Sequence, residues 1–402
     1  MAKVFEGVRV IDFTQVIAGP YASYQLALQG ADVIKVENPK GGDQGRVMMG
    51  ATPEFVQAGQ STLFMSFNSG KRSLGLDLKH PRAMEVLTKL VEQADVVVEN
   101  FKAGQMKKLG LDYETLSAIN PKLVYCSISG FGGTGPLAGK AAYDPVIQAY
   151  SGMMTLTGFP ETGPTKVGFW VTDVAAGIHA AYAISSALFA RERSGQGRYI
   201  DLSMLDAALG FISPMVLHYL NCGIEPILMG NGSPASPSPS VYPTATNRIQ
   251  VATATQAQFE KMCGVLNRPD IKDNPKFSTR EARAENGIAL FEELSKTYQT
   301  GNAHDWEAKL ESVGVPAAVV NTLPETLETE QVKHRGVVME VPPPEGLDRP
   351  MAMVNAAFHL NEGSPGVSTP PPRVGQHTDA VLQQFGFSEA DISSLRSDAA
   401  IG

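Results

Sequence analysis

The sequence predicts an α/β protein with a doubly wound domain on a parallel sheet and a second, smaller α+β domain. Three observations lead to this prediction. In the first third of the chain, short β-branched runs alternate with helical segments of about 10–15 residues, which is typical of βαβ units. The strand runs are almost continuously apolar, as strands buried on both faces are. A stretch rich in Pro, Gly and Ser, residues 223–245, then separates this part from further helices and strands.

The expected elements follow in order along the first part of the chain. Strands are expected at residues 8–13, 31–37, 73–78, 95–101, 123–129 and 199–203. Helices are expected at residues 19–30, closed by Gly30, and at 81–93, with Pro81 near the start; another runs from Asp173 to about Ser194, and an apolar helix reaches about Asn221. Because crossovers between parallel strands are right-handed, helices should cover both faces of the sheet.

The rest of the chain divides into a small domain and a tail. Residues 246–330 should contain strands at 247–255 and 315–321 and helices at 256–266, 280–299 and 303–313. The tail, residues 331–402, should contain strands at 337–341 and 351–360 and two helices ending near Leu395. We therefore expect a large domain in residues 1–222, a linker in 223–245, a small domain in 246–330 and a return segment in 331–402.

Bulk properties indicate an intracellular enzyme. A chain of 402 residues is long enough for two domains with separate cores. The net charge of -8 argues against a partner that is nucleic acid or an anionic membrane. Cys126, Cys222 and Cys263 are widely spaced without a C-x-x-C pair, which favours reduced thiols. No leader pattern and no run of 18 apolar residues occurs, so we expect a cytoplasmic protein that does not enter a membrane.

Asp173 is the residue with the clearest chemical potential. It is a lone carboxylate where an apolar, Ala-rich helix begins. The unpaired amides and the positive dipole end of a helix favour an ionised carboxylate, which can then act as an acceptor or a nucleophile. The alternative is an ordinary N-cap, because Asp is among the preferred residues at that position.

A second motif, the sequence GFGGTG at residues 130–135, matches the dinucleotide fingerprint G-x-G-x-x-G. A working fingerprint must open a helix whose amides hold a pyrophosphate, whereas PLAGKAAYDP follows here. No stretch matches a P-loop either. We therefore expect neither an NAD site nor an ATP site, and no metal site.

Five segments together resemble the family III CoA-transferases, the group that includes formyl-CoA and carnitine CoA-transferases. These segments, in order, are residues 7–46, 68–101, 127–152, 168–204 and 370–395. The resemblance implies that Asp173 is the catalytic nucleophile. It also implies that the tail crosses back to complete the large domain, and that two chains interlock as linked rings in a homodimer.

The expected CoA site lies at the carboxyl ends of the strands, where open α/β sheets bind ligands. Two strands are followed there by Asp77, Leu78 and Lys79, and by Asn100, Phe101 and Lys102. The resemblance adds Ile17, Ala18, Asn38, Lys108, Lys140, Tyr143 and Asp144. Ile17 and Asn38 depart from formyl-CoA transferases, which carry a polar and a basic side chain there. CoA thioesters are expected as substrates, with no permanently bound cofactor.

The resemblance implies a covalent reaction between an acyl-CoA and a small carboxylic acid. Asp173 would form a mixed anhydride with the donor acyl group and then an aspartyl-CoA thioester, which the acceptor acid attacks. Residues 231–240 or 253–259 stand near the place of the mobile loop that covers this site in relatives.

Two other functions stay open. The α-methylacyl-CoA racemases share this fold but use a His-Asp pair, and Tyr143 stands where their histidine lies, while His179 is six residues past Asp173. A non-catalytic CoA-binding protein is the third possibility.

Overall fold

The computed structural model describes residues 3–49, 53–232, 240–344, 347–361 and 363–402. It forms two compact units. The first comprises residues 1–151, 168–216 and 330–402, and the second comprises residues 152–167 and 217–329. Residues 152–167 and 217–222 thus lie in the second unit, whereas the sequence analysis assigned them to the large domain.

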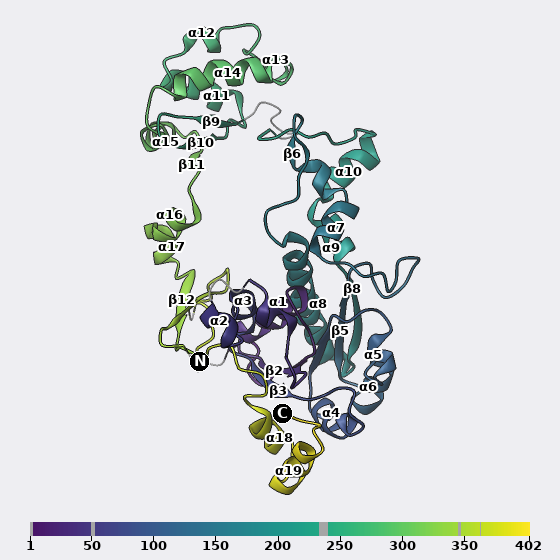
Figure 1. Cartoon of the computed structure of the whole chain (residues 1–402). Coiled ribbons are helices and arrows are strands. Elements are labelled where there is room, and N and C mark those ends of the chain that lie inside the picture. The colour runs from purple at the N-terminus through teal and green to yellow at the C-terminus, as the bar shows by residue number, and fades with distance from the viewer. Residues whose placement is uncertain (1–2, 50–52, 233–239, 345–346, 362) are drawn as a thin grey trace. The chain divides into compact units, whose positions relative to one another are not determined.

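The first unit is built on a six-stranded parallel sheet (Figure 1). Its strands are β1 (Arg9–Asp12), β2 (Asp32–Glu37), β3 (Arg72–Gly75), β4 (Val96–Glu99), β5 (Val124–Ser129) and β8 (Arg198–Ser203). Their order is β3-β2-β1-β4-β5-β8, with every neighbouring pair parallel. The order reverses between β1 and β4, and such a switch point is where open α/β sheets bind ligands. The predicted fold class is confirmed.

Helices cover both faces of this sheet. The first unit contains η1 (Gln44–Val47), α1 (Ala18–Leu28), α2 (Pro53–Gln57), α3 (Thr62–Asn68), α4 (Ala83–Glu92), α5 (Gln105–Lys108), α6 (Tyr113–Ile119), α7 (Asp144–Tyr150), α8 (Val171–Ser194), α9 (Met204–Phe211), α17 (Glu330–His334), α18 (Thr378–Gln384) and α19 (Glu389–Ser397). Helix α8 packs against α1, β5 and β8, while α4, α6, α18 and α19 share a core on the other face. A further helix, α10 (Ser213–Cys222), follows α9, because Pro214 ends the single helix predicted there.

Helix α8 is the one helix in the described part of the chain that is long and apolar enough to span a membrane, by length and composition alone. Its packing on α1 and on the sheet gives another physical reason for the same composition, because the side of a helix that packs on a protein core is apolar too.

The C-terminal segment completes the core of the first unit. Strands β12 (Val338–Val341) and β13 (Met351–Val354) form an antiparallel pair, which is shorter than the strand predicted for 351–360. Val381 and Leu395 are buried in the same cluster as Ile11 of β1. Backbone contacts join the chain end to the sheet edge, because the amide of Gly402 donates to the carbonyl of Gly75 at 3.2 Å.

The second unit contains an antiparallel sheet in the order β11-β10-β9. Its elements are η2 (Met153–Leu156), β6 (Gly158–Phe159), β7 (Gly163–Pro164), β9 (Val241–Pro243), β10 (Arg248–Val251), α11 (Gln256–Val265), α12 (Pro269–Lys272), α13 (Arg280–Glu285), α14 (Gly287–Tyr298), α15 (Ala303–Ser312), β11 (Ala317–Val319) and α16 (Leu323–Glu328). The helix predicted for 280–299 is divided at Asn286, because Asn286 and Gly287 are both weak helix formers.

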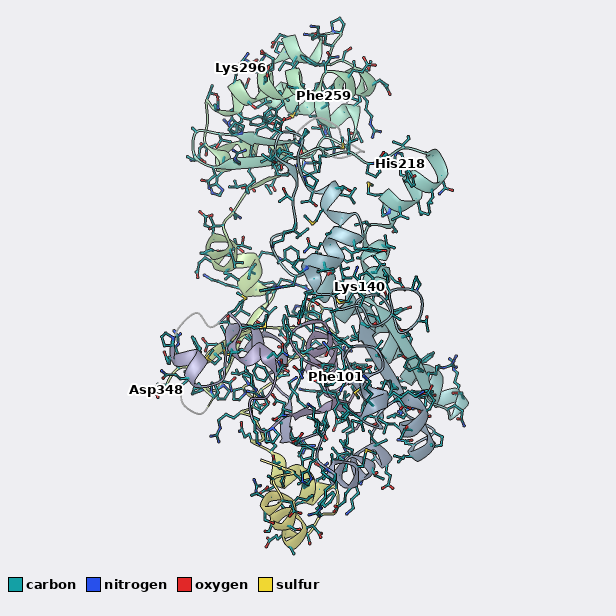
Figure 2. The ribbon with its side chains drawn as sticks, turned by 45° about the vertical axis from the view of Figure 1, so that its right-hand side comes forward. Phe101, Lys140, His218, Phe259, Lys296 and Asp348 are labelled. Atoms are coloured by element: carbon teal, nitrogen blue, oxygen red, sulfur yellow. The ribbon has the colours of Figure 1, made fainter. Side chains whose placement is uncertain are left out.

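One candidate lid is part of the core of this second unit. Residues 253–259 lead into α11, whose start is closed by a capping box between Thr255 and Gln258. Phe259, labelled in Figure 2, is buried in the hydrophobic cluster. Most of the other candidate lid, 231–240, and the middle of the predicted linker, 223–245, lie outside the described residues.

Replacing Leu395 by Ala should destabilise the first unit. The side chain is fully buried, and removing a buried Leu side chain costs about 2–5 kcal/mol. Urea unfolding followed by circular dichroism measures the loss, with the exposed Ser393→Ala as the matched control on the same helix. Equal unfolding midpoints for the two variants would contradict a structural role for the tail.

Candidate active site

A cavity of about 270 Å³ opens at the carboxyl edge of the parallel sheet. It is lined after β1 by residues 15–18, after β4 by residues 100–102 and at the end of β5 by residues 128–130, together with Gln44, Ala142, Tyr143, Asp173 and Met204. All these residues belong to the first unit. The cavity therefore lies at the switch point between β1 and β4.

Asp173 reaches this cavity from the first turn of α8. The helix begins at Val171, with Trp170 as its N-cap, so Asp173 is the third helical residue and not the cap itself. Its side chain is half-buried. The carboxylate is thus available to a ligand in the cavity, which an N-cap engaged with its own helix would not be.

Asp144 is the residue that caps α8. Its Oδ2 accepts hydrogen bonds from the amide of Thr172 at 2.7 Å, from the Thr172 hydroxyl at 2.8 Å and, more weakly, from the amide of Asp173 at 3.4 Å. Its Oδ1 accepts from Gln148 Nε2 at 2.5 Å. Asp144 is almost fully buried, so it satisfies the amides of the helix start from below the cavity.

This capping reverses the electrostatics expected for Asp173. Burial, and then the neighbouring charge of Asp144, raise the pKa of Asp173 to about 7. The sequence analysis expected the helix start to favour the ionised form. The opposite holds because burial disfavours the charged form, and because Asp144 accepts the amides and adds a like charge. Asp173 is consequently a more basic carboxylate than an exposed aspartate.

The start of α1 also lines the cavity. Ile17 is the N-cap of α1 and makes no side-chain capping bond. Among the described residues, the amides of Ile17 and Ala18 have no acceptor. Gly177 lets α8 approach this point closely, since a Cβ there would lie 2.8 Å from the carbonyl oxygen of Ala18. Two backbone donors therefore lie free in the wall of the cavity that contains Asp173.

Six of the predicted CoA residues line the same cavity as Asp173: Ile17, Ala18, Asn100, Phe101, Lys102 and Tyr143. Lys140 and Phe101, labelled in Figure 2, line an adjoining cavity of about 140 Å³. Asn100 already uses its side-chain amide, accepting from the Gln15 amide at 2.9 Å and donating to the Gln15 carbonyl at 2.8 Å. It shapes the cavity rather than offering a free amide to a ligand.

The other predicted contacts lie elsewhere. Two cavities were described above, one lined by Asp173 and the other by Lys140. Neither is lined by the remaining predicted residues, which are Asn38, Asp77, Leu78, Lys79, Lys108 and Asp144. Asn38 follows β2, and its side chain accepts the amide of Lys40 at 2.8 Å. Asp77 follows β3 and accepts the amide of Lys79 at 3.0 Å. Asp144 has the capping role described above, and its contact with CoA stays a prediction.

The sequence analysis missed several residues of the site. Gln15, Val16, Gln44, Ser129 and Met204 line the cavity without having been singled out. Gln44 stands in the run GGDQGR, so the resemblance pointed to its neighbourhood. Val16 carries no signal in the sequence, because its importance lies in its backbone angle.

A histidine does not line this cavity among the described residues. His179 lies on an exposed part of α8, where its Nδ1 is 2.8 Å from the carbonyl oxygen of Ala175. Tyr143 lines the cavity at the position considered for a racemase histidine. Among the described residues that line this cavity, Asp173 therefore contributes the one carboxylate, and no histidine is paired with it.

Known proteins are similar to this chain over most of its length. The family described as CoA-transferase family III matches residues 5–378. A succinate–glutarate CoA-transferase of Agrobacterium fabrum is 37% identical over 94% of this chain and 95% of its own length. An acetyl-CoA:oxalate CoA-transferase of Acetobacter aceti is 36% identical, over 96% and 97% respectively. The crystal structure of a CaiB/BaiF family protein from Brucella suis is 33% identical with a TM-score of 0.83, over 96% of this chain and all of that one.

The raised pKa predicts that Asp173 destabilises the fold at alkaline pH. Because the folded state binds this proton more tightly than the unfolded state, the cost is complete above about pH 7 and fades as the pH falls towards 3.8, the ordinary value. Asp173→Asn should therefore be more stable than the natural protein at pH 8, by about 1–4 kcal/mol, with a smaller difference at pH 5.

Thermal unfolding at the two pH values measures this difference. Glu192→Gln, an exposed change near the other end of α8, is the control and should show no such pH dependence. A stability difference for Asp173→Asn that is equal at both pH values would argue against the raised pKa.

Proposed function

We propose, because this chain belongs to CoA-transferase family III, that Asp173 is the nucleophile that carries CoA from an acyl-CoA thioester to a small carboxylic acid. The single observation that supports this most is the position of Asp173. Its carboxylate has a pKa of about 7 and does not cap its helix. It lines a cavity that is also lined by Ile17 and Ala18, whose backbone amides have no acceptor among the described residues.

The reaction proceeds in four balanced steps. A carboxylate oxygen of Asp173 attacks the thioester carbon, the C–S bond breaks, and CoA leaves as a thiolate with an acyl-aspartyl anhydride behind it. The thiolate attacks the aspartyl carbonyl and releases the donor acid, which leaves an aspartyl-CoA thioester. The acceptor carboxylate attacks the aspartyl carbonyl of that thioester, the C–S bond breaks, and CoA leaves again as a thiolate, which leaves a second anhydride between Asp173 and the acceptor. The thiolate then attacks the acyl carbon of the acceptor, which restores the Asp173 carboxylate.

The pKa of Asp173 lowers the barrier to the first step. An ordinary aspartate, with a pKa of about 3.9, is a much weaker base than the departing thiolate, with a pKa of about 8.5. A pKa of about 7 brings the two groups close to balance. The amides of Ile17 and Ala18 supply hydrogen bonds to the oxyanion, and one such donor contributes about 2.7–4 kcal/mol.

The substrates are proposed from the cavity and the relatives together. Relatives of this chain are named for transfer between succinate and glutarate and for transfer from acetyl-CoA to oxalate. A cavity of about 270 Å³ with the polar side chains of Gln15, Gln44 and Lys102 suits a short dicarboxylic acid. The adjoining cavity at Lys140 suits the pantetheine and phosphate part of CoA, because a lysine pairs with phosphate.

The assembly is also a proposal. Helix α10 has no buried residue, and it exposes Leu217 and Leu220. Apolar side chains gathered on one helix mark an interaction surface, which supports the interlocked homodimer implied by the family resemblance. The cytoplasmic location stays a prediction from the sequence.

The homodimer predicts a mass of twice the chain in solution. Light scattering coupled to size exclusion at micromolar concentration measures that mass. The double change Leu217→Ser and Leu220→Ser should weaken the dimer, because it removes apolar surface from α10. A fully active monomer would refute the proposed assembly.

Asp173→Ala should abolish CoA transfer and leave CoA binding largely intact. Loss of a covalent nucleophile reduces turnover by several powers of ten, whereas the side chain adds little to affinity for CoA. The test is a coupled measurement of new thioesters by mass spectrometry with succinyl-CoA as donor and glutarate as acceptor. A variant that keeps more than roughly a tenth of the turnover would exclude covalent catalysis by Asp173.

Trapping gives the same proposal a second measurement. The natural protein incubated with succinyl-CoA and no acceptor should accumulate the aspartyl-CoA thioester, and hydroxylamine should convert Asp173 to a hydroxamate. Peptide mass spectrometry locates the modification, with Asp173→Asn as the control. A hydroxamate on another residue, such as Glu161, would move the nucleophile there.

A further inference from the structure

The segment between β1 and α1, residues 13–17, contributes to the cavity wall and is held by hydrogen bonds at three consecutive residues, Thr14, Gln15 and Val16. The carbonyl of Thr14 accepts a hydrogen bond from Lys35 Nζ at 2.6 Å. Gln15 is clamped through both of its backbone groups by Asn100, as described above. The amide of Val16 donates to Oδ1 of Asp43 at 2.9 Å. Three separate elements thus determine the path of the chain into α1.

Val16 has a backbone conformation that valine rarely adopts. Its φ is 69°, in the left-handed region, where a β-branched side chain clashes with its own backbone. Such a residue keeps a strained conformation only where the surroundings determine it, and strain of this kind concentrates at functional sites. Val16 lies between β1 and the free amides of α1, so its φ sets the direction in which those amides point.

Asp43 is built to hold this conformation. It is 2% exposed, and its Oδ1 also accepts the amide of Gly45 at 2.7 Å, while its Oδ2 pairs with Lys35 Nζ at 2.9 Å. Burial opposes ionisation, but Lys35 and the two amides outweigh it and keep the pKa of Asp43 below its ordinary value. Lys35 in turn is fully buried in β2. The acceptor for Val16 is therefore a fixed, charged group.

We propose that Asp43, anchored by Lys35, is a positioning residue for CoA transfer: it holds Val16 in its strained conformation so that the amides of Ile17 and Ala18 face the reacting carbonyl. The inference rests on the proposed function, in which these amides bind the oxyanion. A Val16 that relaxed to negative φ would rotate the following peptide units away from the cavity. The Asp43 carboxylate also accepts the amide of Gly45 and so fixes the turn that carries Gln44. The positions of Ile17 and Gln44, which both line the cavity, therefore depend on Asp43.

The test compares two replacements of Asp43. Asp43→Ala removes the acceptor and should lower kcat about 100-fold, as loss of an oxyanion donor does, with the Kd of CoA changed far less. Asp43→Asn keeps an oxygen for the amides of Val16 and Gly45, so its kcat should fall by only about 10-fold or less, since a neutral acceptor makes a weaker bond than a carboxylate.

A rescue variant separates positioning from general damage. Glycine adopts positive φ without strain, so Val16→Gly in the Asp43→Ala background should restore kcat by about 10-fold. Circular dichroism checks that each variant folds. Asp43→Ala could leave Lys35 as an unpaired buried charge and unfold the protein. In that case the double variant Lys35→Met with Asp43→Ala, which removes both charges, takes the place of Asp43→Ala in the comparison of kcat with and without Val16→Gly.

Two results would overturn the inference: a folded Asp43→Ala protein with the natural kcat, or a folded double variant in which Val16→Gly restores nothing. The natural protein in the same assay tests the proposed function separately. Absence of transfer there would refute that function and this inference with it. Transfer by the natural protein with an unaffected Asp43→Ala variant would refute the positioning role alone.

Discussion

Four buried charges under the carboxyl edge of the sheet determine the geometry on which the site depends. Asp12, Lys35, Asp43 and Lys71 are each at most 2% exposed, and they pair as Lys71 with Asp12 and Lys35 with Asp43, both at 2.9 Å. Asp12 of β1 and Lys35 of β2 are also register partners. A buried charge without its partner is very costly, so these pairs hold β1, β2 and the segments that follow them in one arrangement.

Burial and charge pairing also make two carboxylates near the cavity, Asp144 and Asp173, differ from each other. Asp144 is buried and receives the amides of the α8 start, so its charge is compensated. Asp173 lies in the first turn of α8, and burial and the charge of Asp144 raise its pKa to about 7. Two identical side chains thus differ because of their surroundings: one caps a helix, and the other has a raised pKa.

The sequence by itself determined the fold class and much of the site. Short apolar runs and helical periodicity are properties of residues close together in the sequence. They therefore predicted the six parallel strands, with strand boundaries within a few residues of those in the structure. The sheet order then brings residues that follow β1 and β4 to one edge, which explains why Ile17 and Asn100 line one cavity. Local signals were weaker at Asn286 and Pro214, where single predicted helices are in fact interrupted.

Only the tertiary structure decided which polar groups are free. The side chains of Asn100 and Asp144 are engaged by Gln15 and Thr172, which are distant in sequence, while their contacts with CoA stay predictions. The pKa of Asp173 and the strained angle of Val16 likewise depend on partners that no local pattern specifies. The periodicity of apolar residues indicates which side chains of a segment are buried and which are exposed. Hydrogen bonds and charge–charge interactions depend instead on distances that exist only after the chain has folded.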